Sequence, residues 1–428
     1  MAFETFAVRI LGAGLAYVSQ ILLARWMGPH EYGLYSIVWT WVIVLGLFAC
    51  LGFSSSTPRF LPQYWQTNDF GLIRGFMYAS RLSAFIAGCI IAAIGSAIVL
   101  SCNDLIEPYY TGPFLAAFCA LPFFAFATVQ DGIARSHDWS SLAMLPTYIW
   151  RPLLILIGIL VFLLQGVQVT ATMAAIVAVI ATACVALYQY VALSRRLRTN
   201  LDSGPREIRW KYWVLISLPM LLVEGFLQLL TSADVIMVSF WHPPEEVAIY
   251  FAASKTLAIA HFVYFAVRAA AAHRFATFIQ SDDHDGLQAF ARQATLWTFG
   301  GTLCVGVVLA LAAPLFLALF GEGFSSGRPI LIVLLLGILI RASIGPLDAL
   351  LNMSGLEKTC AAIYAATFAV NVALNFVLVV SFGLIGAAWA TTLAICFEVA
   401  ALSFAAHSRL GIQTFFLFHN PFRRASKD

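Results

Sequence analysis

The chain has 428 residues, of which 61% are hydrophobic and only 11% are charged. Soluble globular domains carry about a quarter charged residues, so a water-soluble fold is excluded. The net charge of +3 is too small for the strongly basic surface that nucleic-acid binding needs, and no nucleic-acid partner is expected. A membrane-spanning helix needs about 20 apolar residues, and twelve such helices would use about 240 residues, which this composition can supply.

Apolar runs of spanning length occur in two sets of six. The first set lies near residues 5–26, 33–56, 75–101, 112–134, 142–164 and 170–194, and the second near 212–239, 246–272, 289–319, 327–352, 360–380 and 385–406. The runs lack the two-residue alternation of membrane β-strands. They therefore predict an all-α, multi-pass membrane protein with twelve transmembrane helices and both termini on the same side.

The placement of basic residues predicts the orientation. Of the 24 Lys and Arg residues, 18 fall on the side shared with the termini, two on the opposite side and four within the spans. Because cytoplasmic loops carry the excess of Lys and Arg, both termini are predicted to be cytoplasmic, in the cytoplasmic (inner) membrane. No loop is long enough to form a catalytic domain outside the membrane, and the chain is not expected to be an enzyme.

The two halves of the sequence resemble each other. The polar segment SRRLRTNLDSGPREIRWK, residues 194–211, separates them. The turn WMGPHEYGLY (26–35) matches WHPPEEVAIY (241–250) at an offset of 215 residues, and LLQGVQVTATMAAIVA (163–178) matches GLIGAAWATTLAICFE (383–398) at an offset of 220. Parallel repeats imply two lobes around an axis normal to the membrane. We predict two pseudo-symmetric six-helix lobes, 1–203 and 204–428, with the substrate path between them.

A family resemblance appears in these same motifs. The sequence ILLARWMGPHEYGLYSIVW, followed by TPRFLPQYW, resembles the N-terminal signature of polysaccharide-export flippases, and SADVIMVSFWHPPEEVAIYFAASK in the second half agrees with it. These flippases belong to the multidrug/oligosaccharidyl-lipid/polysaccharide (MOP) transporter superfamily. The resemblance implies a MATE-like fold and movement of a lipid-linked oligosaccharide to the outer leaflet. It also implies membrane lipids and other polysaccharide-assembly membrane proteins as partners.

Basic residues inside the spans are candidates for substrate binding. An ionised group at bilayer depth costs roughly 2.5–3.5 kcal/mol, so it is retained for a reason. Guanidinium groups bind phosphate oxygens in pairs of hydrogen bonds, as a lipid pyrophosphate would require. We predict a cationic, substrate-binding cavity between the lobes lined by Arg151, Lys255 and Arg341, with Arg9 and Arg268 toward its cytoplasmic mouth. The alternatives are that Arg9 extends to the membrane surface, and that Arg151 and Arg341 form structural ion pairs, Arg341 with Asp348.

Acidic residues form a polar stripe in the seventh span. Glu224, Gln228, Thr231 and Asp234 lie close to one line along the helix. Glu224 and Asp234 are predicted to bind a coupling H⁺ or Na⁺ or to act as a gate, and a fixed salt bridge between the lobes is the alternative. Near the cytoplasmic end of the fourth span, Asp131 is four residues from Arg135, which favours an ordinary ion pair along one helix.

Other polar residues lie at span ends or share a helix face. Arg25 and Arg59, like Arg81, are placed to contact a lipid headgroup or a saccharide phosphate at either mouth of the path, and interfacial anchoring is the alternative. In the eighth span Tyr264 and Arg268 lie on one face with His261, which we interpret as an ordinary core histidine.

Two other functions remain open from the sequence. A drug/cation antiporter with the same fold would need acidic residues in the first lobe, where the first span instead offers Arg9. A membrane-embedded polymerase, ligase or acyltransferase would need a large outer loop or an intramembrane catalytic centre, and the histidines are scattered.

The eight cysteines occur singly, without a C-x-x-C pair, so no metal site is expected. No cofactor and no catalytic residue are predicted.

Overall fold

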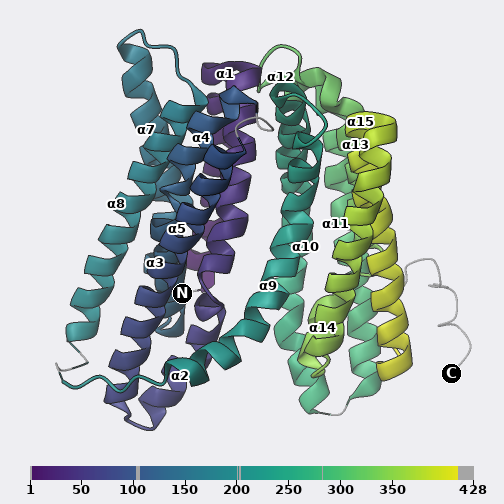
Figure 1. The fold of residues 1–428 in the computed structure, drawn as a ribbon. Helices are drawn as coiled ribbons and strands as arrows, with labels where there is room; N and C mark the ends of the chain where they lie inside the picture. Colours follow the sequence, from purple (N-terminus) through teal and green to yellow (C-terminus); the bar gives the residue numbers. More distant parts are fainter. Residues whose placement is uncertain (1, 103–106, 200, 202–203, 282, 413–428) are drawn as a thin grey trace, which may run out of the picture. The chain divides into compact units, whose positions relative to one another are not determined.

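The computed structural model describes residues 2–102, 107–199, 201, 204–281 and 283–412. Every regular element in this part is a helix, as predicted (Figure 1). In chain order the elements are α1 (Ala2–Ala49), α2 (Phe53–Gln66), α3 (Phe70–Ser101), α4 (Pro108–Phe118), α5 (Leu121–Ser136), α6 (Ser140–Leu145), the π-helical turn η1 (Pro146–Trp150), α7 (Arg151–Leu164), α8 (Ala171–Arg198), α9 (Trp210–Ser239), α10 (Pro244–Gln280), α11 (His284–Leu311), α12 (Ala313–Ala318), the 3₁₀ turn η2 (Phe324–Gly327), α13 (Arg328–Ala342), α14 (Leu347–Met353) and α15 (Glu357–Leu410).

Two helices are too long for a single membrane crossing. At 1.5 Å per residue, the 48 residues of α1 and the 54 residues of α15 each exceed twice the roughly 30 Å of a hydrocarbon core. Each contains one glycine with non-helical backbone angles, Gly28 (φ 80°) in α1 and Gly383 (φ 62°) in α15. These glycines lie between the runs 5–26 and 33–56 and between 360–380 and 385–406, so each long helix holds two of the predicted spans.

The described residues contain nine helices that are long and apolar enough to cross a membrane, or ten if the pair α4–α5, bent by 43°, counts as one span. The division of α1 and α15 at their glycines is additional to this count. The chain is therefore a multi-pass helical membrane protein. The total of twelve crossings and the side on which the termini lie stay predictions.

The run 327–352 is divided, contrary to our expectation of one continuous span. Helix α13 ends at Ala342, and the chain then turns through Gly345, which has φ 64°, into Pro346 and α14. Glycine tolerates this positive φ, and proline cannot continue a hydrogen-bonded helix. Arg341, expected at the middle of a span, consequently lies in the last turn of α13.

The helices group into two compact units. The first comprises Met1–Ser239 with Pro243–Ala248, and the second comprises Phe240–His242 with Ile249–Asp428. Helix α9 belongs to the first unit because it packs against α1 and α2. The predicted lobe boundary at 203–204 follows the sequence repeat rather than this packing, and it stays a prediction.

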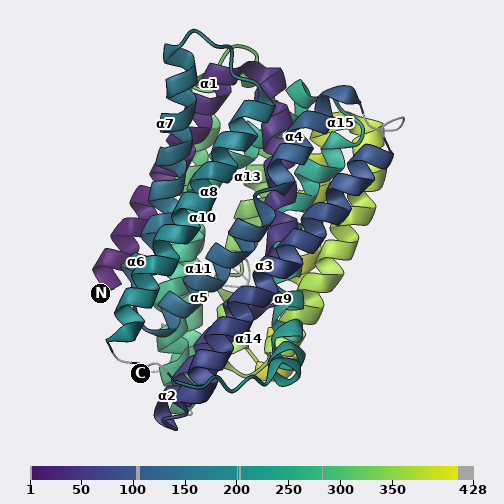
Figure 2. The ribbon, with the colours of Figure 1, turned by 60° about the vertical axis from the view of Figure 1, so that its left-hand side comes forward.

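Helices α3, α5 and α8 lie side by side in the first unit (Figures 1 and 2). A cluster of buried aromatic rings at one end of this layer joins α2, α3 and α9. Within it, Phe76 packs edge-on against Trp213, and Trp213 Nε1 donates a hydrogen bond to the Tyr64 hydroxyl at 2.9 Å. Polar tips of large aromatic rings need such a partner when they are buried. The cluster therefore fixes the start of α9 against α2 and α3.

The polar segment before α9 is docked on α3. The backbone N–H of Glu207 donates to the Gly71 carbonyl at 3.0 Å, and Arg74 Nε donates to the Pro205 carbonyl at 3.0 Å. A Cβ atom on Gly75 would lie 1.8 Å from the Glu207 carbonyl oxygen, far inside van der Waals contact. Only glycine at position 75 permits this approach, so residues 204–209 lie directly against the helix.

Gly75→Ala is expected to displace segment 204–209 from α3 and to lower the stability by about 1–3 kcal/mol, as overpacking typically does. Limited trypsin digestion of the detergent-purified protein should then cut faster after Arg206 and Arg209. Gly14→Ala is the matched control, because nothing lies within 4 Å of a Cβ at that position. Equal digestion rates for the two variants would contradict the docking.

The two repeated turns contact each other. His30 Nδ1 lies 2.7 Å from Glu245 Oε1, and these positions are equivalent in the repeat, since they are 215 residues apart. Close by, a Cβ on Gly33 would lie 1.8 Å from the Pro244 carbonyl oxygen. The small residue in the first turn therefore allows the second turn to approach it backbone to backbone.

Candidate functional site

Arg151 is held by aromatic rings in the first unit. It begins α7, immediately after the π-helical turn η1, and its guanidinium carbon lies 5.7 Å from the Trp39 ring centre and 5.5 Å from that of Phe124. Such cation–π contacts stabilise a partly desolvated cation without neutralising it. The structural ion pair considered for Arg151 is not formed with any carboxylate of the described residues. Its positive charge is thus available to an anion.

Asp131 is bonded across helices rather than along its own. Gln189 Nε2 on α8 donates to Asp131 Oδ1 at 2.5 Å, and the Thr147 hydroxyl in η1 donates to Oδ2 at 3.1 Å. Arg135 Nε reaches only the backbone carbonyl of Asp131, at 3.3 Å. The expected ion pair along α5 was wrong, because the carboxylate turns inward to partners that the sequence separation concealed. These bonds join α5, α8 and η1 just before Arg151.

The second unit contains a buried network centred on Asp348. Arg268 Nε donates to Asp348 Oδ2 at 2.7 Å, and the Tyr264 hydroxyl donates to Oδ1 at 2.7 Å. The side chain of Asp348 is only 4% exposed. The prediction that Tyr264 and Arg268 share one face of their helix is confirmed by their common partner. Helix α10 is thereby joined to α14.

A second ion pair extends this network. Arg341 Nη2 on α13 lies 3.0 Å from Glu398 Oε1 on α15, and the guanidinium carbon of Arg341 lies 5.0 Å from the ring centre of Tyr264. Glu398, not Asp348, is therefore the ion-pair partner of Arg341, which corrects the structural pair we had considered. Two arginines and two carboxylates together make the network neutral.

Lys255 differs from the two arginines of its unit. Its Nζ atom lies 4.6 Å from the centre of the Phe251 ring on the same helix, α10. Within the described part of the chain it has no carboxylate at ion-pair distance. Of the five basic residues predicted to bind substrate, Arg151 and Lys255 thus have no ion-pair partner among the described residues, whereas Arg268 and Arg341 are paired. Helix α1 includes Arg9, but the Arg9 side chain lies outside the described residues. The cavity between lobes stays a prediction.

Removing one partner of the Arg341–Glu398 pair is expected to destabilise the protein by about 3–5 kcal/mol, because the other charge is left buried without compensation. Arg341→Gln and Glu398→Gln should each lower the melting temperature in detergent, and the double variant should lose less than the sum of the two. Arg328→Gln, at an exposed arginine that begins the same helix, is the control. Strictly additive losses would show that the two side chains do not interact.

The acidic stripe of α9 is described in the first unit. Glu224 is half-buried and Asp234 is 8% exposed. Between them, Gln228 Nε2 donates to the Ser232 hydroxyl at 2.8 Å, and the Thr231 hydroxyl donates to the Gln228 carbonyl at 2.9 Å. The middle of the stripe is thus satisfied within the helix. The coupling or gating role of Glu224 and Asp234 stays a prediction.

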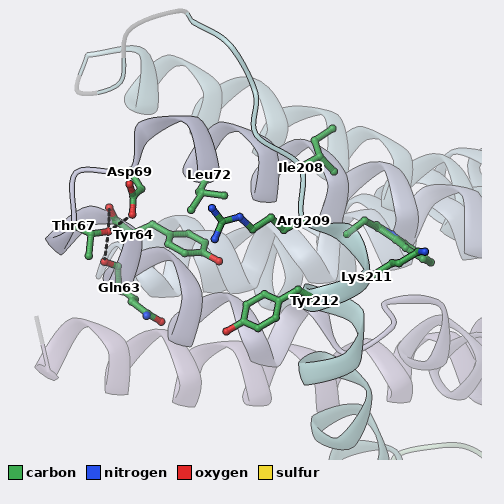
Figure 3. Close-up of a pocket in the computed structure, with 10 residues that line it drawn as sticks. Gln63, Tyr64, Thr67, Asp69, Leu72, Ile208, Arg209, Lys211 and Tyr212 are labelled. Carbon is green, nitrogen blue, oxygen red and sulfur yellow. Dashed lines mark hydrogen bonds between the residues drawn. The ribbon is translucent and has the colours of Figure 1, made fainter.

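The arginines predicted at the mouths, Arg25 on α1 and Arg59 on α2, are both exposed. Near Arg59 in sequence, a pocket of about 780 Å³ lies between the end of α2 and the segment that starts α9 (Figure 3). Its wall combines aromatic rings and polar groups, including Tyr64, Tyr212 and Arg209, and Figure 3 shows the Arg209 guanidinium directed toward the Tyr64 ring. Aromatic faces with adjacent polar groups are suited to sugars.

Arg209 carries a fixed positive charge at this pocket. Its Nε donates to Glu207 Oε1 at 2.8 Å, and this hydrogen bond and the carboxylate charge raise the pKa of Arg209 above its usual value. Sequence reasoning treated the polar segment 194–211 only as a connection between the halves. The signal that could have found the pocket was the alternation of aromatic and basic residues from Arg209 to Tyr212.

Comparison of the sequence with models of known protein families identifies the family of this chain. A profile described as "Polysaccharide biosynthesis protein" matches residues 2–273, and one described as "MatE" matches residues 219–377. The first match covers more than half of the sequence. The chain belongs to the polysaccharide biosynthesis protein family. No match is found among curated proteins.

Solved structures show the fold of this family member. A multidrug resistance MATE family transporter of the MOP superfamily, in an inward-facing conformation, is similar with a TM-score of 0.77 and 14% identity over 93% of this chain and 94% of that one. The lipid II flippase MurJ is similar with a TM-score of 0.75 and 14% identity over 94% of this chain and 87% of that one. A MOP superfamily transporter from Pyrococcus furiosus has a TM-score of 0.62 and 15% identity over 95% and 93%.

These matches confirm two predictions. The resemblance to the MOP superfamily and the MATE-like, all-α membrane fold are both correct. The similar structures are transporters and a flippase by name, which agrees with the expectation that the chain is a transporter and not an enzyme.

Proposed function

We propose that this protein is a flippase that moves a lipid-linked, anionic saccharide from the cytoplasmic to the outer leaflet of the cytoplasmic (inner) membrane. The observation that carries the proposal is the match of residues 2–273 to the polysaccharide biosynthesis protein family. The similarity to the lipid II flippase MurJ supports a lipid-linked substrate. Membrane lipids and other polysaccharide-assembly membrane proteins would be its partners.

The two cations that have no ion-pair partner support an anionic substrate. Arg151 and Lys255 rest on aromatic rings and have no carboxylate at ion-pair distance among the described residues. A substrate phosphate would supply the missing negative charge, with Arg9 and the paired Arg268 and Arg341 able to add further contacts. The sugar head must cross about 30 Å of hydrocarbon, and a path lined by such cations replaces the hydration that the phosphate loses. No bond is made or broken in this process.

The membrane potential is the proposed source of free energy. A negative charge that leaves the cytoplasm gains roughly 2.3 kcal/mol per 100 mV. Return of the empty carrier would be coupled to H⁺ or Na⁺ bound at Glu224 and Asp234, which would favour one arrangement of the protein over the other.

A MATE-like drug/cation antiporter is the second candidate, and the MatE match over residues 219–377 supports it. The two functions predict opposite substrate charge. A cationic substrate would be repelled by Arg151 and Lys255, whereas an anionic one would be attracted.

The deciding experiment reconstitutes the protein in vesicles and measures the transfer of a fluorescent polyprenyl-diphosphate saccharide between leaflets. We expect protein-dependent transfer that accelerates when the membrane potential is negative on the loading side. In cells, deletion should cause a lipid-linked saccharide to accumulate, identified by mass spectrometry. Transport of a cationic dye with no transfer of the lipid would favour the antiporter instead.

Charge reversal at these two cations should block transfer. Lys255→Glu and Arg151→Glu are each expected to reduce the initial rate about tenfold or more, because loss of a charge-assisted hydrogen bond typically costs about 1.5–3 kcal/mol. Lys358→Glu and Arg195→Glu make the same charge changes at exposed positions and should transfer at the parent rate. Full activity of both interior variants, with normal melting temperatures, would refute the substrate-binding role.

Neutralising the acids of α9 should slow turnover more than it weakens binding. For Glu224→Gln and Asp234→Asn we expect a lower maximal rate and a nearly unchanged substrate concentration for half-maximal rate. Glu357→Gln, at an exposed acid, is the control. The rates are to be measured with the potential, the proton gradient and the sodium gradient varied separately. If neither variant responds differently to any gradient, these acids have only a structural role.

A further inference from the structure

A second basic pocket lies in the first unit, and its lining includes Arg81, which the sequence places at the end of a span. It has a volume of about 520 Å³ and lies between α3, the facing parts of α5 and α8, and the docked segment before α9. Three arginines line it, Arg74 and Arg81 on α3 and Arg206 on the segment. Among the described residues that line it, none is acidic. The pocket is therefore suited to an anion.

Arg81 is the most informative of the three. Its Nε and Nη2 atoms are enclosed, yet neither has a hydrogen-bond partner among the described residues. Its guanidinium carbon lies 5.3 Å from the ring centre of Tyr190 on α8, which holds the side chain in place without satisfying its donors. Leaving enclosed donors of a charged group unsatisfied is costly. A ligand that accepts hydrogen bonds would remove that cost.

The other two arginines are held in position by the protein. Arg74 Nε is fixed by the Pro205 carbonyl, and the Arg206 guanidinium carbon lies 4.2 Å from the ring centre of Tyr78. The docking of segment 204–209 on Gly75 is what brings Arg206 beside the arginines of α3. The positions of the three cations are thus set before a ligand arrives.

An apolar groove continues from this pocket along α3. The neighbouring pocket, of about 460 Å³, shares Tyr78 and Leu82 with the basic pocket and extends past Ile86 to Ile90. The twelve residue-to-residue steps of helix from Tyr78 to Ile90 correspond to about 18 Å. These four side chains recur every fourth residue and are each 41–53% exposed. A free phosphate would use only the arginines, whereas a lipid would use both pockets.

We propose that the two pockets form one binding site for an anionic phospholipid of the surrounding bilayer. Its phosphate is bound by Arg81 and Arg206, with Arg74 at the edge, and one acyl chain lies in the groove over Leu82, Ile86 and Ile90. The three arginines would face the phosphate, and the apolar groove beyond them would face the acyl chain. This arrangement matches a lipid whose charged headgroup is followed by hydrocarbon. The basic end lies on the side predicted to be cytoplasmic.

Native mass spectrometry of the full-length protein in detergent tests the site with dioleoyl phosphatidylglycerol as the probe. Arg81→Gln and Arg206→Gln should each weaken retention of the first bound lipid by about tenfold. Arg206 is exposed on a loop, so its variant remains informative even if Arg81→Gln fails to fold. Arg195→Gln is the charge-matched control, since this exposed arginine of α8 does not line the pocket. Retention equal to that of the control in both pocket variants would overturn the proposal.

The groove and the headgroup are tested separately. Leu82→Gln should weaken lipid retention, while Ile94→Gln, on the same exposed stripe but outside both pockets, should not. Glycerol phosphate, the soluble headgroup, should compete only at concentrations at least a hundredfold higher than the lipid. Equal competition by glycerol phosphate would identify a phosphate site in place of a lipid site. Tighter retention of a polyprenyl phosphate than of phosphatidylglycerol would overturn the assignment to a bilayer phospholipid.

Discussion

An ionised side chain in hydrocarbon must be compensated, and this constraint organises the polar interior of the protein. The second unit meets it by pairing Arg268 with Asp348 and Arg341 with Glu398, with Tyr264 between the two pairs. These contacts connect α10, α13, α14 and α15. A buried ion pair adds little net stability over an apolar equivalent, but breaking it is costly. The network therefore acts mainly to specify how these four helices pack, since most alternative arrangements would separate charge.

The first unit meets the same constraint in another way. The Asp131 carboxylate is stabilised by hydrogen bonds from Gln189 and Thr147, and Arg151 is stabilised by the faces of Trp39 and Phe124. Aromatic contacts do not themselves supply an anion, and the same holds for Lys255 on Phe251 and for Arg81 on Tyr190. Cations that carry fixed partners serve structure, whereas cations that rest only on rings are the ones that can serve a ligand. This difference could not be read from residue type.

The sequence predicted the elements better than it predicted the side-chain partners. Apolar runs are local, so the helices could be located, and the breaks between predicted runs coincide with the non-helical glycines Gly28 in α1 and Gly383 in α15. The shared face of Tyr264 and Arg268 followed from helical periodicity alone. The Arg341–Glu398 pair could not be predicted, because its members are 57 residues apart and several helices offered a carboxylate. Gly345 and Pro346 are typical turn residues, but they stand within a long apolar run, so the sequence analysis predicted one continuous span there. The docking of segment 204–209 depends on one close backbone approach at Gly75. No pattern of residue types in the sequence predicts that approach.

The docked segment also bears on how the protein is made. Helix α3 ends at Ser101, about a hundred residues before the segment that lies on it, so it has left the ribosome well before that segment emerges. Residues 205–207 can therefore pack against α3, at Gly71, Arg74 and Gly75, while the second unit is still being translated. Domains generally fold from the N-terminus during synthesis. Since the contacts of α9 with α1, α2 and α3 lie within the first unit, α9 can be positioned before the helices of the second unit are made.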